Sequence, residues 1–343
     1  MQVFSESQST ALLLVCTVAA FLLSQSVTGE PESPDGVWQV APQTLRPGPT
    51  GSFDSVAVKD PSIVFFEGNW HLFYTARDED HYTTGYVRAP RLESLQGATR
   101  YELARVRSKK ERYGCAPQIF YFEPHKQWYL LFQNRDSNYQ PMLCHNANIS
   151  DPSSWSTPEV LLRKDSPQKW IDFWIICDPH RAHLFYTEGH RGIMHRSTKL
   201  EEFPHGWGPA KQVFSGVHEA AHIYKVLHRS EYHMIYERNT PEGRCWGLAI
   251  ADTLDGTWHK VTDRYATGDQ LHYAPTEKKW TEMVSHGEAI RSGYDQHLEY
   301  DPADGRWLIQ GILRSQSHAP YPTLPWQLGI ITKMPSRQIS KPQ

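Results

Sequence analysis

The sequence predicts an all-β fold, a single-domain propeller of five blades. One plan occurs five times: a polar or acidic residue opens a hydrophobic strand, a turn follows, and an aromatic-rich strand returns. The five copies cover residues 60–76, 118–133, 172–189, 219–237 and 295–312. Repetition at roughly fifty residues is typical of radially repeated β-architectures with one blade per copy. No window of the sequence shows a helical stripe over four turns.

Each copy predicts two strands joined by a turn. The apolar runs are β-branched or aromatic, as strands require, and examples are 64–66, 71–74, 128–133 and 184–186. Turn-forming residues divide the halves of the copies at 67–69, 123–125, 178–180, 228–230 and 304–305. Segments 148–155 and 252–258 are rich in turn residues, which suits connections between the outer strands of a blade.

The repeat also groups three acidic residues. Asp60, Asp172 and Glu219 open the first, third and fourth copies, and we take these as equivalent points of three blades. Equivalent points of different blades face one end of a shared axis. The sequence therefore predicts that three carboxylates, far apart along the chain, converge there.

The copies follow one another without a linker, so we expect a single catalytic domain over residues 51–335. Residues 1–29 have the apolar stretch 11–23 and then small residues around Val27 and Gly29, the pattern of a signal peptide. Its leading region lacks Lys and Arg and contains Glu6, which departs from that pattern. Residues 30–50 form a Pro-rich lead-in and 336–343 a tail. We expect a secreted, extracellular protein.

Composition limits the partners of this protein. The net charge is −3 and no basic run is present, so nucleic acid is not an expected partner. The apolar stretch near the N-terminus is too short for a comfortable membrane span, and we expect a monomer without a membrane partner. After removal of the expected signal peptide, which contains Cys16, four cysteines remain, at 115, 144, 177 and 245. This even number permits disulfides in three pairings. Cys177 lies in an apolar strand and is expected as a buried thiol.

Residues 218–222 read His-Glu-Ala-Ala-His, which matches the H-E-x-x-H motif of zinc peptidases. That chemistry requires a helix, because only there do positions i and i+4 bring both imidazoles to one ion. The following residues, 223–227, have the composition of a strand. On a strand, His218 and His222 would stand roughly 13 Å apart, at about 3.3 Å per residue. A zinc peptidase is therefore retained only as an alternative.

Several segments resemble glycoside hydrolase family 62, a family of secreted α-L-arabinofuranosidases that remove arabinose from arabinoxylan. The segments lie in the family's order, at 58–61, 116–121, 170–174, 218–221, 285–288 and 324–329. The resemblance extends over residues 38–332. Members of this family are five-bladed propellers, in agreement with the fold predicted from the repeat.

The resemblance implies inverting hydrolysis by three acidic residues. Asp60 corresponds to the general base that activates water, and Glu219 to the general acid that protonates the departing xylosyl oxygen. Asp172 corresponds to a third carboxylate that orients the sugar and raises the pKa of the acid. An inverting enzyme separates its base and acid by about 6.5–9.5 Å to admit a water molecule. Residues of different blades can supply that separation.

Further residues are assigned to substrate binding. The resemblance implies that Lys59 lines the pocket, although on a regular strand it would point away from it unless the strand is bulged. Gln118 opens the second copy and can bind hydroxyl groups on the axis. Arg291 and Tyr321 correspond to positions that bind arabinose or the xylan backbone, and Trp128 to an aromatic platform for xylan.

The resemblance also assigns His286 as a ligand for a structural calcium ion on the axis. Calcium prefers oxygen ligands, so such an ion would be largely hydrated. No organic cofactor is expected.

The chain departs from the family pattern at three positions. Residues 325–329 read Pro-Trp-Gln-Leu-Gly where Pro-Tyr-Arg-Leu-Gly is common, Pro322 follows Tyr321, and His218 replaces the usual aromatic residue before the acid. These departures leave open how the xylan backbone is held. The alternatives are a related propeller hydrolase acting on another arabinose-containing glycan, and a xylan-binding propeller without catalysis.

Overall fold

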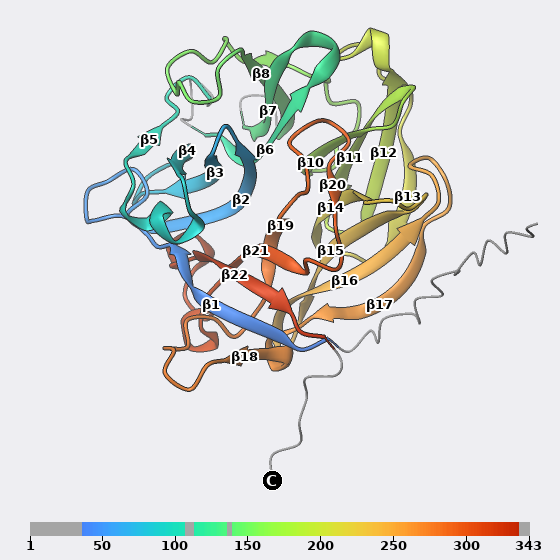
Figure 1. Ribbon diagram of the computed structural model, residues 1–343. Helices are drawn as coiled ribbons and strands as arrows, with labels where there is room; N and C mark the ends of the chain where they lie inside the picture. The colour runs from blue at the N-terminus through green and yellow to red at the C-terminus, as the bar shows by residue number, and fades with distance from the viewer. Residues whose placement is uncertain (1–35, 107–112, 136–138, 336–343) are drawn as a thin grey trace, which may run out of the picture. The chain divides into compact units, whose positions relative to one another are not determined.

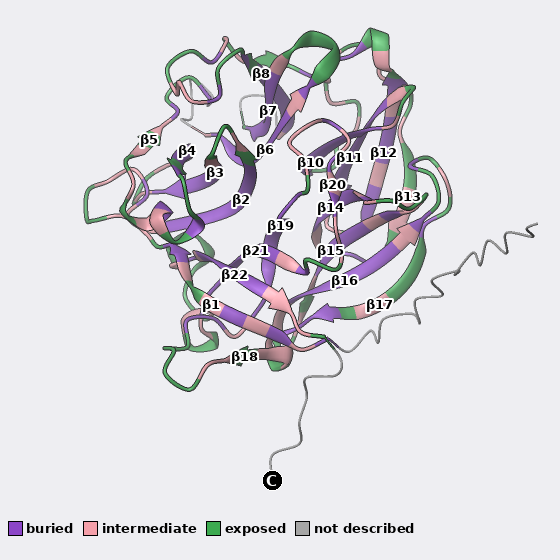
Figure 2. Ribbon diagram, viewed as in Figure 1, coloured by how far each residue is buried: buried purple, intermediate pink, exposed green. Residues whose placement is uncertain are grey.

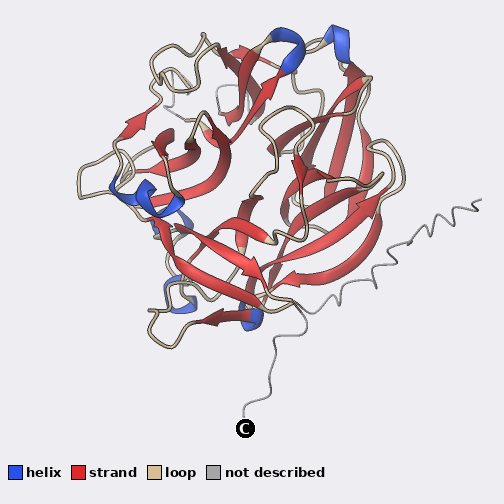
Figure 3. Cartoon of the chain, viewed as in Figure 1, coloured by secondary structure: helices blue, strands red, loops and turns tan. Residues whose placement is uncertain are grey.

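The computed structural model describes residues 36–106, 113–135 and 139–335 (Figure 1). The expected signal peptide, 1–29, and the expected tail, 336–343, lie outside the described residues. The described chain is built almost entirely of strands, with a few short 3-10 helices in the connections (Figure 3). None of the helices that the structure describes has the length and apolar character needed to cross a membrane.

Five sheets form the five blades of a propeller, which confirms the predicted fold. The first blade contains β2 (Ala57–Phe66), β3 (Asn69–Arg77), β4 (Tyr82–Ala89) and β5 (Arg100–Glu102), and the second β6 (Cys115–Phe122), β7 (Gln127–Asn134), β8 (Gln140–Asn146) and β9 (Glu159–Val160). The third contains β10 (Trp170–Cys177), β11 (Arg181–Glu188), β12 (Gly192–Lys199) and β13 (Lys211–Ser215).

The fourth blade contains β14 (Glu219–Val226), β15 (Tyr232–Thr240), β16 (Gly243–Ala251) and β17 (His259–Ala266), with the short β20 (Glu299–Tyr300) parallel to β14. The fifth contains β19 (Ser285–Ala289), β21 (Arg306–Gly311), β22 (Gln327–Lys333), β1 (Trp38–Leu45) and β18 (Leu271–Tyr273). The 3-10 helices are η1 (Leu92–Gly97), η2 (Glu123–His125), η3 (Leu200–Glu202), η4 (Gly268–Gln270), η5 (Arg314–Gln316) and η6 (Tyr321–Thr323).

The fifth blade corrects two expectations. Its inner strand is β19, whereas the expected fifth copy at residues 295–312 supplies β20 to the fourth blade and β21 to the fifth. The expected lead-in, 30–50, contains β1, which pairs antiparallel with β22 from the end of the chain. Both ends of the described chain therefore build one blade, and this pairing closes the ring.

Apolar side chains fill the space between the blades, and the inner strands are the most buried part of the structure (Figure 2). Trp128, Trp170, Trp174, Trp246 and Trp307 are all nearly inaccessible to solvent. The aromatic richness of the sequence is thus used largely for packing between sheets. The cysteines at 115, 144, 177 and 245 are all buried free thiols, so the disulfides that their even number permits do not form among the described residues.

A bulge interrupts the beginning of each inner strand. The register of β2 with β3 shifts between Lys59 and Ser62, and corresponding shifts occur in β6, β10, β14 and β19. In the first four blades one residue of the bulge has a positive φ, at Asp60, Ala116, Asp172 and Ala220. Non-glycine residues rarely adopt this conformation, so its repetition in four blades shows that the bulge is a regular part of the blade.

The bulges also correct the expected equivalence of the three carboxylates. Asp60 and Asp172 occupy the positive-φ position of their bulges, and Ala220 occupies it in the fourth blade. Glu219, one residue earlier, is therefore equivalent to Lys59 and not to Asp60. The longer glutamate side chain starts from a neighbouring backbone position and still reaches the same cavity.

Candidate active site

A cavity of about 380 Å³ lies at the end of the inner strands where the bulges occur. Six of the residues assigned from the sequence line it: Lys59, Asp60, Asp172, Glu219, His286 and Tyr321. They come from four blades and from η6, between 59 and 321 in the chain. The fold thus brings together the three carboxylates that the repeat predicted to converge.

Asp60 is held as an ion pair with its neighbour. Lys59 Nζ lies 3.0 Å from Asp60 Oδ2 and donates a hydrogen bond of 3.0 Å to the Tyr321 hydroxyl. Burial opposes ionisation of Asp60, but the Lys59 ammonium outweighs it, with His286 assisting, and lowers the pKa of this carboxyl. The bulge lets the adjacent residues 59 and 60 both face the cavity, which a regular strand forbids. Asp60 is consequently a carboxylate at neutral pH.

Side-chain hydrogen bonds from the second strand of the preceding blade join four of the five bulges to that blade. Gln310 Oε1 accepts from the amide of Asp60 at 2.7 Å. The same relation joins Thr75 to Ala116, Gln133 to Asp172, and Glu237 to His286. These acceptors all sit opposite the start of the inner strand of their own blade. These hydrogen bonds fix the bulges relative to one another across blade boundaries.

The junction between the third and fourth blades differs. The position equivalent to Thr75 is Thr187, but its buried hydroxyl has no hydrogen-bond partner in the described residues. Instead Asp172 Oδ2 accepts the amide of Ala220, at 3.1 Å. Burial, reinforced by the charges of Glu219 and Asp60, holds the pKa of Asp172 well above its usual range. The Asp172 carboxyl is thus hydrogen-bonded directly to the bulge next to Glu219.

Glu219 shares one arginine with a second, buried glutamate. Arg244 Nη1 donates short hydrogen bonds to Glu219 Oε1 and to Glu237 Oε1. Burial opposes ionisation of Glu219, but Arg244, with His218 and His190 assisting, outweighs it and lowers the pKa to about 2. Burial raises the pKa of Glu237 to about 7 despite the same arginine. The two glutamates therefore differ in protonation although both contact one guanidinium nitrogen.

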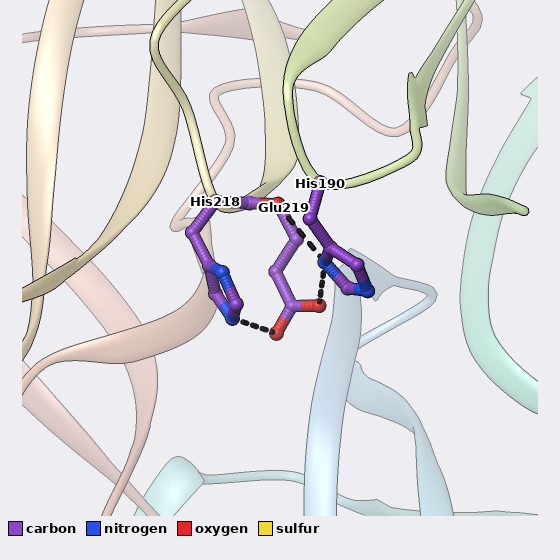
Figure 4. Close-up of side chains that lie close together, drawn as sticks. All are labelled: His190, His218 and Glu219. Atoms are coloured by element: carbon purple, nitrogen blue, oxygen red, sulfur yellow. Dashed lines mark hydrogen bonds and ion pairs between the residues drawn. The ribbon is translucent and has the colours of Figure 1, made fainter.

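Two imidazoles flank the Glu219 carboxylate (Figure 4). His190 Nδ1 lies 3.5 Å from Oε2, and His218 Nε2 lies 3.6 Å from Oε1. The rings are nearly parallel, with centroids 5.0 Å apart and an interplanar angle of 21°. Among the described residues, these three form the one group of histidine, cysteine and acidic side chains close enough to share a metal ion.

His286 lies in the cavity, but its surroundings do not form a calcium cage. Its Nδ1 is 3.8 Å from Asp60 Oδ1, and that carboxylate is already paired with Lys59. Calcium takes six to eight oxygen ligands, whereas the cations Lys59 and Arg244 both face this imidazole. A calcium ion here would depend on water for most of its ligands, and no chemical step is assigned to it.

The zinc-peptidase geometry is absent because residues 219–226 form β14. His222 is buried, its ring stacks on Trp174 with centroids 4.1 Å apart, and its Nδ1 lies 2.5 Å from the carbonyl oxygen of Gly287. His218 faces the cavity instead. The two imidazoles of the motif are therefore in separate environments, as the composition of the strand predicted.

The model of the family described as "Glycosyl hydrolase family 62" matches residues 46–332. The chain belongs to glycosyl hydrolase family 62. It is 29% identical over 289 residues to α-L-arabinofuranosidase C of Cellvibrio japonicus. The aligned region covers 80% of this chain and 44% of that protein. The chain thus spans less than half the length of this curated relative.

Solved structures of the family have the same fold. The catalytic domain of the Coprinopsis cinerea family 62 α-L-arabinofuranosidase is 27% identical, with a TM-score of 0.80, over 88% of this chain and 98% of that one. A family 62 hydrolase in complex with xylotriose is 28% identical, with a TM-score of 0.79 and the same coverage. The five-bladed arrangement and the resemblance found in the sequence are both confirmed.

Three residues assigned to substrate binding lie away from the cavity of this family 62 chain. Gln118 is buried and bonds the backbone of Ile175 through both amide atoms, at 2.7 Å each. Trp128 is buried in the core. Arg291 pairs with Glu288 at 2.8 Å and donates to backbone carbonyls of two blades. The structure does not bring these three side chains to the cavity: Gln118 and Arg291 bond backbone groups of neighbouring blades, and Trp128 packs in the core.

Sequence reasoning missed Arg244 and His190, which line the cavity, and Glu237, which is fully buried and contacts Arg244. Arg244 and Glu237 lie on β16 and β15, outside any segment that resembled the family motifs, and His190 follows β11. Glu237 does close the fourth repeat copy, at the position where the first copy has Thr75. That equivalence was the one available signal, because a charged residue there departs from the neutral side chains of the other copies.

Proposed function

We propose that this protein is an inverting glycoside hydrolase that releases terminal α-L-arabinofuranosyl groups from arabinoxylan. The observation that carries the proposal is the convergence of Asp60, Asp172 and Glu219 on one cavity of a family 62 propeller. The named relatives are arabinofuranosidases, and a related structure holds xylotriose. The xylan backbone and its arabinose branch are the corresponding substrate here.

In the proposed reaction, Asp60 accepts a proton from water as this water attacks the anomeric carbon. The lowered pKa of Asp60 keeps this carboxyl ionised and able to act as a base. Lys59 holds this carboxylate in place and is itself hydrogen-bonded to the Tyr321 hydroxyl. The water adds to the face of the sugar opposite the departing xylosyl oxygen, so the anomeric configuration inverts.

Glu219 gives its proton to the departing oxygen, and this requires a change at Arg244. In the substrate-free protein the guanidinium holds Glu219 ionised. Arg244 is also held by Glu237 and lies over the rings of Tyr321 and Trp326, at 5.6 and 5.8 Å from the ring centroids. It can therefore leave Glu219 without losing its other partners. Burial then raises the pKa of Glu219, and the carboxylate takes up a proton from solvent before it acts as the acid.

Asp172 is the third carboxyl of the proposed site. Its raised pKa lets it hold a proton in the substrate-free cavity, and its Oδ2 anchors the bulge at Ala220. We propose that it binds the sugar. Once ionised, its negative charge opposes the ionisation of Glu219. A nearby like charge raises the pKa of a carboxyl, which favours proton retention by the acid.

The proposal includes export, a monomeric state and a hydrated calcium ion at His286. Residues 1–29 would be removed as a signal peptide, which N-terminal sequencing of extracellular protein tests. Size-exclusion chromatography with light scattering tests the monomer. Elemental analysis of the purified protein, before and after a chelator, tests the calcium.

One experiment tests the activity, its linkage and its stereochemistry together. Proton NMR during digestion of arabinoxylan is expected to show free β-L-arabinofuranose as the first product from α-linked branches. Release of the α-anomer first would contradict inversion, and loss of arabinose from arabinan but not from arabinoxylan would favour the related-hydrolase alternative. Xylan binding without release of any sugar would favour a non-catalytic propeller.

A further inference from the structure

We infer that His190, His218 and Glu219 form a binding site for a divalent transition-metal cation such as Zn²⁺ at the mouth of the cavity. The three side chains converge from two elements. His218 and Glu219 lie where β14 begins, and His190 lies in the turn between β11 and β12. Figure 4 shows the carboxylate between the two imidazoles.

The distances suit a tetrahedral ion. Zinc lies about 2.0–2.2 Å from imidazole nitrogen and carboxylate oxygen, so neighbouring ligand atoms in a tetrahedron are about 3.3–3.5 Å apart. The nitrogen–oxygen separations here are 3.5 Å from His190 Nδ1 to Glu219 Oε2 and 3.6 Å from His218 Nε2 to Oε1, so each imidazole lies near a different oxygen of the carboxylate. All three ligand atoms lie within 4.8 Å of one another. The two rings are nearly parallel, so the rings must turn before both nitrogen lone pairs point at one ion.

The donor set selects the class of cation. Two imidazoles and one carboxylate are the protein ligands of a common zinc site, whose fourth position holds water. Imidazole suits Zn²⁺, Cu²⁺ and Ni²⁺, whereas Ca²⁺ and Mg²⁺ require more oxygen ligands. The side chains are part-exposed, at 36% for His190, 24% for His218 and 15% for Glu219. A hydrated ion can therefore approach them from the solvent.

Two features oppose the ion and set its affinity. Arg244 is positive and contacts Glu219, but it is shared with Glu237, so the three groups carry one net negative charge when both carboxyls are ionised. His190 Nδ1 also lies 3.2 Å from the carbonyl oxygen of His218, and metal binding requires its lone pair to turn to the ion instead.

The site is distinct from the calcium position expected at His286 and has a different consequence. A cation bound by Glu219 occupies the carboxylate that donates the proton in the proposed reaction. Bound Zn²⁺ would thus make the enzyme reversibly inactive. The binding itself depends only on the three ligands and not on the proposed function.

Calorimetric titration of Zn²⁺ alone into the substrate-free protein at pH 7.5 tests the inference. We expect one ion per chain, and at least about tenfold weaker binding in each of His190→Phe and His218→Phe, since each removes a ligand and keeps an aromatic ring. His180→Gln, at an exposed histidine in the β10–β11 turn, is the matched control and is expected to bind like the wild type. Thermal melting establishes that every variant is folded.

The outcomes are decisive in both directions. No saturable binding to the wild type, or equal affinity of the wild type and both phenylalanine variants, overturns the inference. Co²⁺ gives an independent readout, because a tetrahedral site shows visible absorption that His218→Phe should lose. None of these measurements needs turnover, so a failure of the proposed activity would leave them interpretable.

Discussion

The carboxylate of Asp172 accepts a 3.1 Å hydrogen bond from the amide of Ala220, the residue that follows Glu219. The other bulges bond a glutamine, threonine or glutamate that lies on the second strand of the preceding blade. At this junction a residue of the proposed reaction replaces such a structural acceptor. The positions of two candidate catalytic carboxyls are therefore coupled through one backbone amide.

This coupling predicts different outcomes for two substitutions of Asp172. Asp172→Asn keeps an oxygen acceptor for the Ala220 amide, whereas Asp172→Ala leaves that buried amide unsatisfied, which costs about 1–3 kcal/mol of unfolding free energy. We expect both variants to lose arabinose release but only the alanine variant to lose stability. Urea denaturation measures the difference, and equal stability of the two variants would contradict the structural role.

Asp60→Asn and Glu219→Gln should each reduce arabinose release from arabinoxylan by roughly 10²–10⁴-fold, the usual contribution of a general base or acid. Each substitution preserves the size of the side chain, so the fold should be retained. Initial rates measured by arabinose detection, with circular dichroism as a check on folding, test this. Glu201→Gln, at an exposed position in η3, is the control, and turnover near the wild-type rate in either site variant would reject the assignment.

Arg244 is expected to set the high-pH limb of the activity profile, where the catalytic acid loses its proton. Its charge, with His218 and His190 assisting, lowers the pKa of Glu219 to about 2 in the substrate-free protein, so removing that charge raises this pKa. Arg244→Met should therefore move the pH above which kcat/KM falls to a higher value, whatever the loss of rate. Arg244→Lys keeps the positive charge and should leave that limb near its wild-type position. Superimposable pH profiles for the methionine variant and the wild type would exclude this role.

Glu237 predicts a dependence of stability on pH. Its pKa is about 7 in the folded protein, above the ordinary value for an unfolded chain, so the folded state holds a proton that the unfolded state releases. This stabilisation is complete below about pH 4 and is lost as the pH rises through 7. Glu237→Gln does not titrate, so its melting temperature relative to the wild type should be higher at pH 8 than at pH 5. A constant difference would refute the raised pKa.

Part of the site was accessible from the sequence because it lies within the repeat. Asp60, Asp172 and Glu219 are close to a recurrent feature, the start of an inner strand, and their convergence follows from the rotational arrangement of blades. Lys59 was assigned correctly to the cavity only through the resemblance, since alternation along a strand would direct it away. The bulge that reverses this expectation depends on hydrogen bonds between blades, which no local pattern records.

Gln118, Trp128 and Arg291 show the opposite case. Each has a residue type suited to binding sugar, yet each is buried and contacts other parts of the propeller instead of the cavity. A polar or aromatic side chain that joins two sheets has the same local sequence as one that faces a ligand. Burial distinguishes them, and burial is a property of the assembled propeller.

The sequence by itself determined the strand composition, the number of blades and the family, because alternation, turns and repeated motifs are local patterns that can be read from the linear sequence. Tertiary structure decided that β1 pairs into the fifth blade, that bulges offset Glu219 from Asp60 by one position, that Arg244 and His190 line the cavity, and that Glu237 contacts Arg244. These are contacts between residues distant along the chain. Their energies depend on burial and on charges brought within a few ångströms, which exist only after the blades have closed into a ring.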